Sequence, residues 1–184
     1  TRLRSPAPDS ALHVDSVARD GEGRVELSAT RPRYVLHRLE LDVGDIDGDG
    51  RNDVAFSHSE RAGHAVAWYR SATPRADSTW RKQPVATVDY CHTLQAADFD
   101  LDGSVDLLVG GMIQSQHRGL KLMRNAGGGT NWAELGIQTN GSYSAELGDI
   151  DNDGDLDIVG IRNWNAAPTW IYRNNARSPG LNKQ

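Results

Sequence analysis

The sequence predicts an all-β protein built from a repeated antiparallel sheet, and three observations support this prediction. First, an acidic loop of the pattern D-x-D-x-D-G-x-x-D occurs three times, with starts 53 and 51 residues apart. Second, alternating apolar and polar residues precede each loop and a short apolar run follows it, as expected for strands on either side of a turn. Third, no stretch of the chain has the period of an amphipathic helix. The three loops are residues 45–53, 98–106 and 149–157.

Each repeat contains strand-like segments in the same order. The alternating residues before the loops are Leu39, Leu41 and Val43, then Leu94 and Ala96, then Ala145 and Leu147. The apolar runs after the loops are residues 54–56, 107–109 and 158–160. A third segment ends in an arginine in every repeat, at Arg70, Arg124 and Arg173. A fourth segment appears in two repeats, at residues 80–87 and 132–139. Repeats of about four short strands in about 50 residues predict β-propeller blades.

The repeats divide the chain into five parts. Residues 1–33 form an N-terminal segment, whose alternating stretch 24–30 we expect to donate a strand to a blade. The three repeats and the tail are residues 34–88, 89–140, 141–175 and 176–184, and the third repeat lacks its fourth strand. Blades bury their faces against neighbours, so three blades leave two open sides. We therefore expect three antiparallel four-stranded blades of a propeller that is partial or is completed by oligomerisation.

The charge distribution narrows the range of functions. The chain has 25 acidic and 20 basic residues and a formal net charge of -5. Thirteen aspartates and one base, Arg51, lie in the three loops, which therefore carry -12 while the remainder carries +7. The basic stripe that a nucleic-acid partner requires is missing. No apolar run approaches the ~20 residues of a transmembrane helix, and the single cysteine, Cys91, excludes an internal disulfide framework.

The acidic loops have the composition of calcium sites. Carboxylates so close together repel one another and destabilise a compact loop unless a cation neutralises them. Oxygen ligands at positions one, three, five and nine suit Ca2+, with the carbonyl of position seven as a further ligand and a glycine at position six for the sharp turn. The predicted ligands of the three Ca2+ sites are Asp45, Asp47, Asp49, Arg51 and Asp53; Asp98, Asp100, Asp102, Ser104 and Asp106; and Asp149, Asp151, Asp153, Asp155 and Asp157.

Other metal sites fit the loops less well. An EF-hand requires a bidentate glutamate at position twelve, where this chain has Phe56, Val109 and Gly160. Mg2+ keeps several waters and demands octahedral geometry, and Zn2+ favours histidine or cysteine ligands, which the loops lack.

The three loops and the hairpins that hold them resemble the FG-GAP/VCBS repeats, which include those of integrin α-chain propellers. The resemblance covers about residues 36–175. It implies that each loop joins two strands of a propeller blade and binds Ca2+ through the aspartates already named. It also implies a secreted, extracellular or cell-surface protein with a role in binding or adhesion. The chain differs from the family in having three repeats where complete propellers usually have seven, and in lacking a clear phenylalanyl-glycine and glycyl-alanyl-proline pair in each repeat.

Two classes of function remain open. The first is a module that binds a glycan or a cell-surface protein, and Trp164 and Trp170, which flank an Asn/Pro-rich loop, are its candidate ligand residues. The second is a structural subunit of an extracellular oligomer or fibre, whose partner is a second copy of the chain or further propeller blades. A sequon for glycosylation starts at Asn140.

The sequence favours an enzymatic function least, and we expect that the chain is not an enzyme. Some polysaccharide lyases carry His, Tyr and Arg on a propeller face, so a polysaccharide-active enzyme is the specific alternative. The candidate residues for it are His37, His58, His64, His92, His117 and Tyr143. His92 and Tyr143 each lie six residues before a loop, so the repeat itself accounts for their equivalent positions.

Overall fold

The computed structural model describes residues 16–19, 25–28, 39–73, 80–162 and 168–176. The chain divides into two units, and the first comprises residues 1–36 and 71–81. In this unit β1 (Ser16–Arg19) pairs antiparallel with β2 (Val25–Ser28) to form a two-stranded sheet. The stretch 24–30 was expected to join a blade, and its described part, β2, has β1 as its partner. Donation of this stretch to a blade of another copy stays a prediction, and the remainder of residues 1–33 lies outside the described residues.

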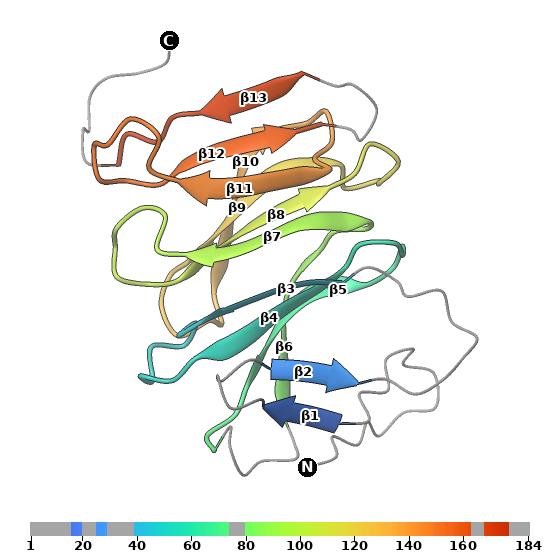
Figure 1. Cartoon of the computed structure of the whole chain (residues 1–184), viewed down its shortest axis with the longest axis vertical. Helices are drawn as coiled ribbons and strands as arrows, with labels where there is room; N and C mark the ends of the chain where they lie inside the picture. The colour runs from blue at the N-terminus through green and yellow to red at the C-terminus, as the bar shows by residue number, and fades with distance from the viewer. Residues whose placement is uncertain (1–15, 20–24, 29–38, 74–79, 163–167, 177–184) are drawn as a thin grey trace. The chain divides into compact units, whose positions relative to one another are not determined.

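The second unit, residues 37–70 and 82–184, contains three antiparallel sheets, which we call blades 1, 2 and 3 (Figure 1). Blade 1 consists of β3 (Leu39–Gly44), β4 (Asp53–His58), β5 (Ala65–Arg70) and β6 (Arg81–Thr87). Blade 2 consists of β7 (Cys91–Ala97), β8 (Asp106–Gly111), β9 (Gly119–Asn125) and β10 (Trp132–Gln138). Blade 3 consists of β11 (Ser144–Gly148), β12 (Asp157–Ile161) and β13 (Thr169–Tyr172).

Strands that follow one another in the sequence are neighbours within each blade, so every blade is an antiparallel meander. The described residues therefore form sheets of four, four and three strands, and they contain no helix. This confirms the predicted all-β class and is compatible with propeller-like blades. No helix of the described part is long and apolar enough to cross a membrane.

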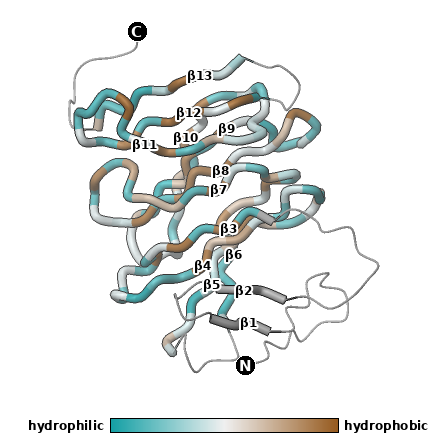
Figure 2. Tube along the Cα trace, in the orientation of Figure 1, coloured by the Kyte–Doolittle hydropathy of each residue, from teal (hydrophilic) through white to brown (hydrophobic). Residues whose placement is uncertain are grey.

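Two hydrophobic clusters lie between the blades. The first joins residues of blades 1 and 2 and includes Trp68, Leu94 and Leu107, while the second joins blades 2 and 3 through Leu108, Leu120, Ala145 and Ile158. The first strand of blade 2, β7, contacts the first strands of both neighbours, β3 and β11. The interior strand β8 is buried at every residue, as expected for a strand with apolar clusters on both faces. Figure 2 shows hydrophobic residues along the strands of the blades.

The centre of the first cluster depends on one glycine. The indole of Trp68 is buried and donates a hydrogen bond of 2.8 Å to the carbonyl of Gly129, in the turn between β9 and β10. Gly129 has a φ of +64°, and a Cβ placed on it would lie 2.5 Å from the ring of Trp68. Only glycine adopts this backbone at low cost and leaves room for the indole.

The burial of β3 differs from the sequence prediction. Alternation places Leu41 and Val43 on the side expected to be buried, but these side chains are 45% and 56% exposed. The opposite side of the strand faces blade 2, where the Asp42 carboxylate accepts a hydrogen bond of 2.7 Å from the amide of Ala96. The alternation has the correct period but indicates the wrong face, because the face that lies against blade 2 carries the partly buried Asp42, whose carboxylate is satisfied by that blade.

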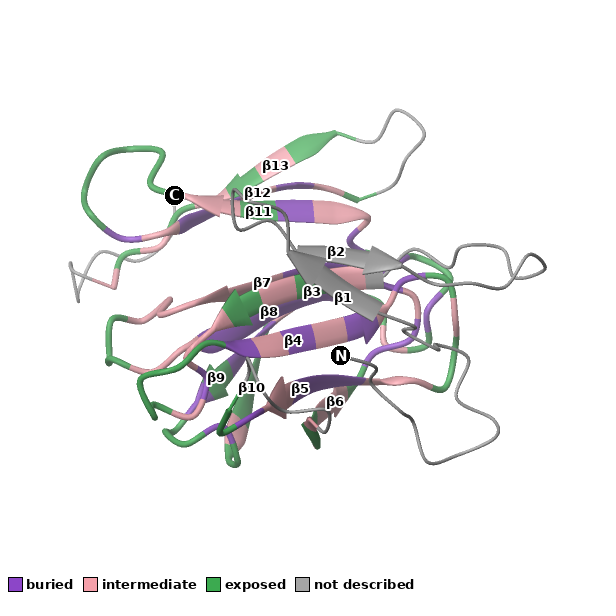
Figure 3. Cartoon of the chain, turned by 60° about the horizontal axis from the view of Figure 1, so that its bottom comes forward, coloured by how far each residue is buried: buried purple, intermediate pink, exposed green. Residues whose placement is uncertain are grey.

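The last strand of blade 3 is the least covered of its sheet. Every residue of β13 is intermediate or exposed, and Ile171 is 56% exposed (Figure 3). Strand β4 contrasts with it, because its residues alternate between buried and intermediate along the whole strand. Blade 3 thus presents an apolar residue on a strand whose outer edge pairs with no described strand.

Candidate metal centre

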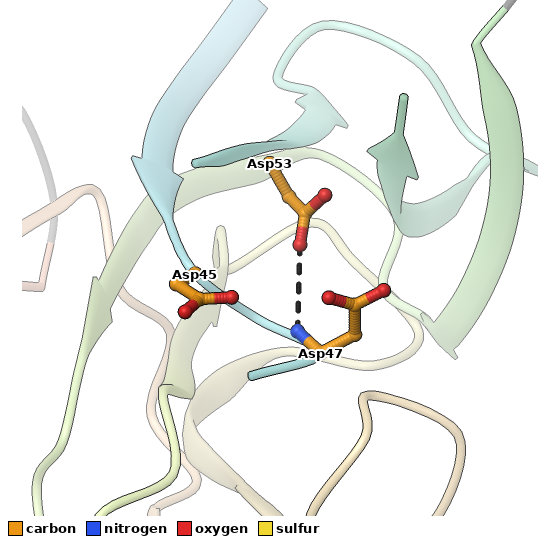
Figure 4. Close-up of side chains that lie close together, drawn as sticks. All are labelled: Asp45, Asp47 and Asp53. Atoms are coloured by element: carbon orange, nitrogen blue, oxygen red, sulfur yellow. Dashed lines mark hydrogen bonds between the residues drawn. The ribbon is translucent and has the colours of Figure 1, made fainter. Parts of the chain in front are cut away.

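The three acidic loops occupy the same place in every blade, between the first and second strands. Position nine of each loop is the first residue of the second strand, and these three aspartates are buried: Asp53, Asp106 and Asp157. In the first loop the side chains of Asp45, Asp47 and Asp53 lie around a common point (Figure 4). The structure therefore brings together, within each loop, carboxylates that the sequence pattern singled out.

The glycine at position six forms the turn that closes the loop. Its φ is +83° at Gly50, +91° at Gly103 and +92° at Gly154, a backbone that favours glycine. In each loop the amide of this glycine donates a hydrogen bond to the aspartate at position one. The three bonds, to Asp45, Asp98 and Asp149, are 2.8, 3.0 and 3.1 Å long. The turn thus holds the first carboxylate of each loop in a fixed position.

The carboxylate at position nine is held from two sides. One of its oxygens accepts a hydrogen bond from the amide of position two, with lengths of 3.1, 3.3 and 3.0 Å for Ile46, Phe99 and Ile150. In blades 2 and 3 the other oxygen accepts from the amide of an asparagine that follows the predicted third segment. These bonds, from Asn125 and Asn174, are both 2.8 Å long.

Carboxylate oxygens converge in all three loops. One oxygen from each residue lies within 4.8 Å of the others in three sets: Asp45, Asp47 and Asp53; Asp98, Asp100 and Asp102; and Asp149, Asp151 and Asp157. Positions one and three belong to every set, joined by position nine in the first and third loops and by position five in the second. The predicted ligands outside these sets are the side chains of Asp49, Asp106 and Asp153 and the carbonyls of Arg51, Ser104 and Asp155, and they stay predictions.

The donor atoms fit a hard cation. The Oδ1 atoms of Asp45 and Asp100 are buried and have no hydrogen-bond partner among the described residues. A buried carboxylate oxygen without a partner is costly, and an oxygen-only set of this kind suits Ca2+. The residues present therefore fit the predicted ion at the first and second loops.

Burial also changes the acidity of two of these aspartates. Burial, assisted by the neighbouring carboxylate of Asp47, raises the pKa of Asp53 to about 6. The pKa of Asp106 is also raised to about 6, first by burial and then by the charge of Asp100. The charged form of each group is disfavoured where the protein alone surrounds it, so a nearby cation would favour ionisation.

Each loop also contacts the arginine at the end of the third segment, a residue to which the sequence pattern assigned no role. Arg70 Nη1 lies 3.1 Å from Asp47 Oδ2, Arg124 Nε donates a hydrogen bond of 2.6 Å to Asp100 Oδ2, and Arg173 Nη1 lies 3.6 Å from Asp151 Oδ2. The position-three aspartate is a partner in every case, and Arg70 also lies 3.6 Å from Asp49 at position five. The hydrogen bond with Asp100 raises the pKa of Arg124. An arginine ends the third segment in all three repeats, and this recurrence was the sequence signal that could have pointed to the ion pairs.

The asparagine after this arginine links neighbouring blades. Asn125 of blade 2 donates a side-chain hydrogen bond of 2.8 Å to the carbonyl of Ile46 in the loop of blade 1. Asn174 of blade 3 donates an equivalent bond of 2.8 Å to the carbonyl of Phe99 in the loop of blade 2. Position two of the acidic loop is therefore tied to the following blade.

The described histidines that were considered for catalysis each have a close aromatic or acidic neighbour. The ring of His92 stacks on Tyr143 at 4.9 Å, with its Nε2 3.2 Å from a Glu60 oxygen. His58 and His64 have ring centroids 4.0 Å apart. His117 lies 3.3 Å from Asp89, and His37 lies outside the described residues. Among the residues that the structure describes, the groups able to hold a metal are the three aspartate sets alone.

The two tryptophans considered for ligand binding have different positions. Trp164 lies outside the described residues. Trp170 is half-buried, packs against the cluster between blades 2 and 3, and lies 4.9 Å from the ring of Tyr172. Its ring also fills the space beside Gly160, where a Cβ would lie 2.4 Å from it. This tryptophan therefore has a packing role in blade 3. The sequon residue Asn140 is exposed.

Comparison with known families agrees with the repeat analysis. A family profile described as FG-GAP-like repeat matches residues 45–109 and 98–160. The two matches together extend from the first acidic loop to the end of the strand after the third, which is more than half of the chain. No curated protein matches the chain significantly.

Proposed function

The chain belongs to the family of FG-GAP-like repeats, and from this we propose that it is a calcium-binding β-propeller-type module whose Ca2+ ions stabilise the blades. The observation that supports this proposal most directly is the convergence of carboxylate oxygens within 4.8 Å in three equivalent loops. Repetition of one geometry in three blades is difficult to explain as a chance surplus of surface acids.

The residues that would hold the ions are the aspartates at positions one and three of each loop. Position nine joins them in the first and third loops and position five in the second. The ion would supply positive charge at a point where carboxylates otherwise repel one another. Position nine begins the second strand, and position one directly follows the first strand. Neutralising these charges would therefore hold the first two strands of blades 1 and 3 together, and would stabilise the turn between these strands in blade 2.

The expected contribution of calcium binding to the free energy of unfolding is a substantial share of the stability of a typical domain. Extracellular modules bind Ca2+ with dissociation constants of about 0.1–1 mM. At a concentration about ten times the dissociation constant, one site contributes roughly 1.4 kcal/mol by linkage. Three independent sites would contribute roughly 4 kcal/mol, against about 5–15 kcal/mol for the unfolding of a typical domain.

Calorimetric melts in calcium and in chelator test the proposal. We expect millimolar Ca2+ to raise the melting temperature by roughly 10 °C, because about 1 kcal/mol shifts the melt by about 2–4 °C in a chain of this size. Asp98→Asn should remove about a third of that shift. Glu134→Gln, which removes a carboxylate that pairs with Lys121 outside the loops, is the matched control and should keep the whole shift. An identical melt of the parent in Ca2+ and in excess chelator would contradict the proposal.

We propose that the module acts outside the cell in binding or adhesion, with a glycan or a protein as its ligand. Sites with the affinity assumed above would be filled only where calcium is abundant, so a secreted or cell-surface location is the one in which they would stabilise the blades.

The alternative function is a structural subunit of an oligomer or fibre. The exposed Ile171 on β13 and the exposed Leu41 and Val43 on β3 favour it, because apolar residues at the ends of a stack of blades are suited to contact with further blades. In that case the partner is a second copy of the chain or blades from another protein.

A further inference from the structure

The three arginines that end the predicted third segments contact the acidic loops in one consistent way. Each guanidinium pairs with the Oδ2 of the position-three aspartate, whose carboxylate belongs to the converging set of its loop. The arginines reach the loops from other strands or from just after them: Arg70 ends β5, Arg124 lies within β9 and Arg173 follows β13. The chain thus places an arginine from the third segment beside each proposed calcium site, and the first loop has a second arginine, Arg51, which lies 3.2 Å from Asp49.

A fixed positive charge beside such a site acts on both states of the loop. Without the ion, it reduces the repulsion among the carboxylates and so stabilises the empty loop. With the ion bound, it repels the divalent cation and competes for the same carboxylate. Both effects lower the affinity of the loop for the ion, so they add.

We infer that Arg70, Arg124 and Arg173 are internal counter-cations that stabilise the calcium-free loops and lower their affinity for Ca2+. This inference rests on the proposed function. The arginines set the concentration at which the loops fill, and they keep the blades folded when calcium is scarce. They are not expected to be ligands of the ion.

The three ion pairs differ in exposure and in distance, so we expect the arginines to lower the calcium affinity of their loops by different amounts. The partner of Arg70 is the most buried, since the side chain of Asp47 is 7% exposed against 20% for Asp100. Arg173 has the most exposed side chain of the three, at 68%, and a longer distance of 3.6 Å to Asp151. Exposed pairs are screened by water and salt. We therefore expect the effect to be weakest at Arg173.

The test is Arg124→Gln, compared with Lys121→Gln as its matched control. Lys121 lies on the same strand and is ion-paired with Glu134 at 2.8 Å, away from the loop, so its substitution removes the same charge and one ion pair. Calcium binding is measured by titration calorimetry, and melting temperature is measured in chelator and in Ca2+.

We expect Arg124→Gln to melt lower than the parent in chelator, to show a larger calcium-induced shift, and to gain one site of about three- to tenfold higher affinity. Lys121→Gln should leave the affinity unchanged. Arg124→Lys, which keeps the charge, should bind Ca2+ within about twofold of the parent. The gain should decrease in about 0.5 M salt, where screening is strong.

Unchanged or weaker binding by Arg124→Gln, with the parent binding normally, overturns the inference and leaves the proposed function intact. A parent that binds no Ca2+ overturns both. Should Arg124→Gln fail to fold, Arg173→Gln gives the same reading at a more exposed position, with a smaller gain expected and with unchanged or weaker binding again overturning the inference.

Discussion

Position four of each acidic loop has a left-handed backbone, with φ of +76° at Gly48, +62° at Leu101 and +61° at Asn152. Glycine and asparagine adopt this conformation readily, whereas a leucine there is strained by roughly 1 kcal/mol. The Leu101 side chain is 41% exposed and so gains little from packing in return. The second loop therefore holds backbone strain that the first and third loops avoid.

Replacing this leucine by the residue found in the third loop should stabilise the protein. We expect Leu101→Asn to raise the free energy of unfolding by about 0.5–1 kcal/mol, because asparagine tolerates the left-handed conformation. Leu101→Ala keeps the unfavourable Cβ and is the control, with no gain expected. The measurement is urea unfolding in chelator, and equal midpoints for parent and Leu101→Asn would contradict the assignment of strain.

Sequence reasoning found most of the candidate site at this scale and missed what depends on distant contacts. The spacing of the aspartates identified residues whose carboxylates do converge, because loop geometry is a local property. The pattern could not show that Arg124 pairs with Asp100 or that Asn125 reaches Ile46, since these contacts join residues 24 and 79 positions apart. Their recurrence in successive repeats was visible, but its physical reason was not.

At the scale of elements, the junction between blades 1 and 2 depends on Asn125. This side chain is 1% exposed and donates to the carbonyls of Ile46 and Val105, while its oxygen accepts from the amides of Gly127 and Gly129. One residue thus joins the loop of blade 1 to the turn of blade 2 that supports Trp68. The equivalent place in blade 1 holds Ser71, which lacks the side-chain amide of asparagine.

Removing this side chain should destabilise the protein strongly. Asn125→Ala leaves buried carbonyls and amides without partners, and each such loss costs about 1–3 kcal/mol. We expect the free energy of unfolding to fall by about 2–4 kcal/mol, measured by urea unfolding in Ca2+. Asn131→Ala is the matched control, because Asn131 is exposed at the same turn, and it should stay within about 0.5 kcal/mol of the parent. A loss for Asn125→Ala no larger than the control's would refute the role of this junction.

The order of the strands was predictable and their packing was not. Period-two alternation, apolar runs and acidic turns identified the strands of all three blades, because each is a short-range signal. Alternation at Leu41 and Val43 indicated the wrong buried face, since burial depends on which blade lies beside the strand. The pairing of β2 with β1 was likewise not predicted, because pairing preference is not encoded in one strand alone.

At the scale of the whole molecule, the exposure of the side chain at position two of each loop depends on whether another blade follows. Ile46 is 1% exposed beneath blade 2, and Phe99 is intermediate and packs against the cluster shared with blade 3. Ile150, the equivalent residue of blade 3, is 42% exposed. The same position therefore changes from core to surface along the repeats, as expected if the surface beside Ile150 is suited to a further blade.

We expect the protein to associate with itself through this surface in millimolar Ca2+. Exposed apolar residues and an unpaired strand edge favour contact with another copy. Ser71 on blade 1 cannot make the side-chain amide bond that Asn125 and Asn174 make to the loop of the neighbouring blade, so we expect this contact to be weaker and to depend on protein concentration. Light scattering should give a mass above the 20.1 kDa of one chain. Ile150→Asp should shift the population towards the monomer, while Leu135→Asp, which alters a side chain 53% exposed on β10, should not. A well-folded parent that stays a monomer at every concentration in millimolar Ca2+ would contradict self-association and leave a different protein as the partner of this surface.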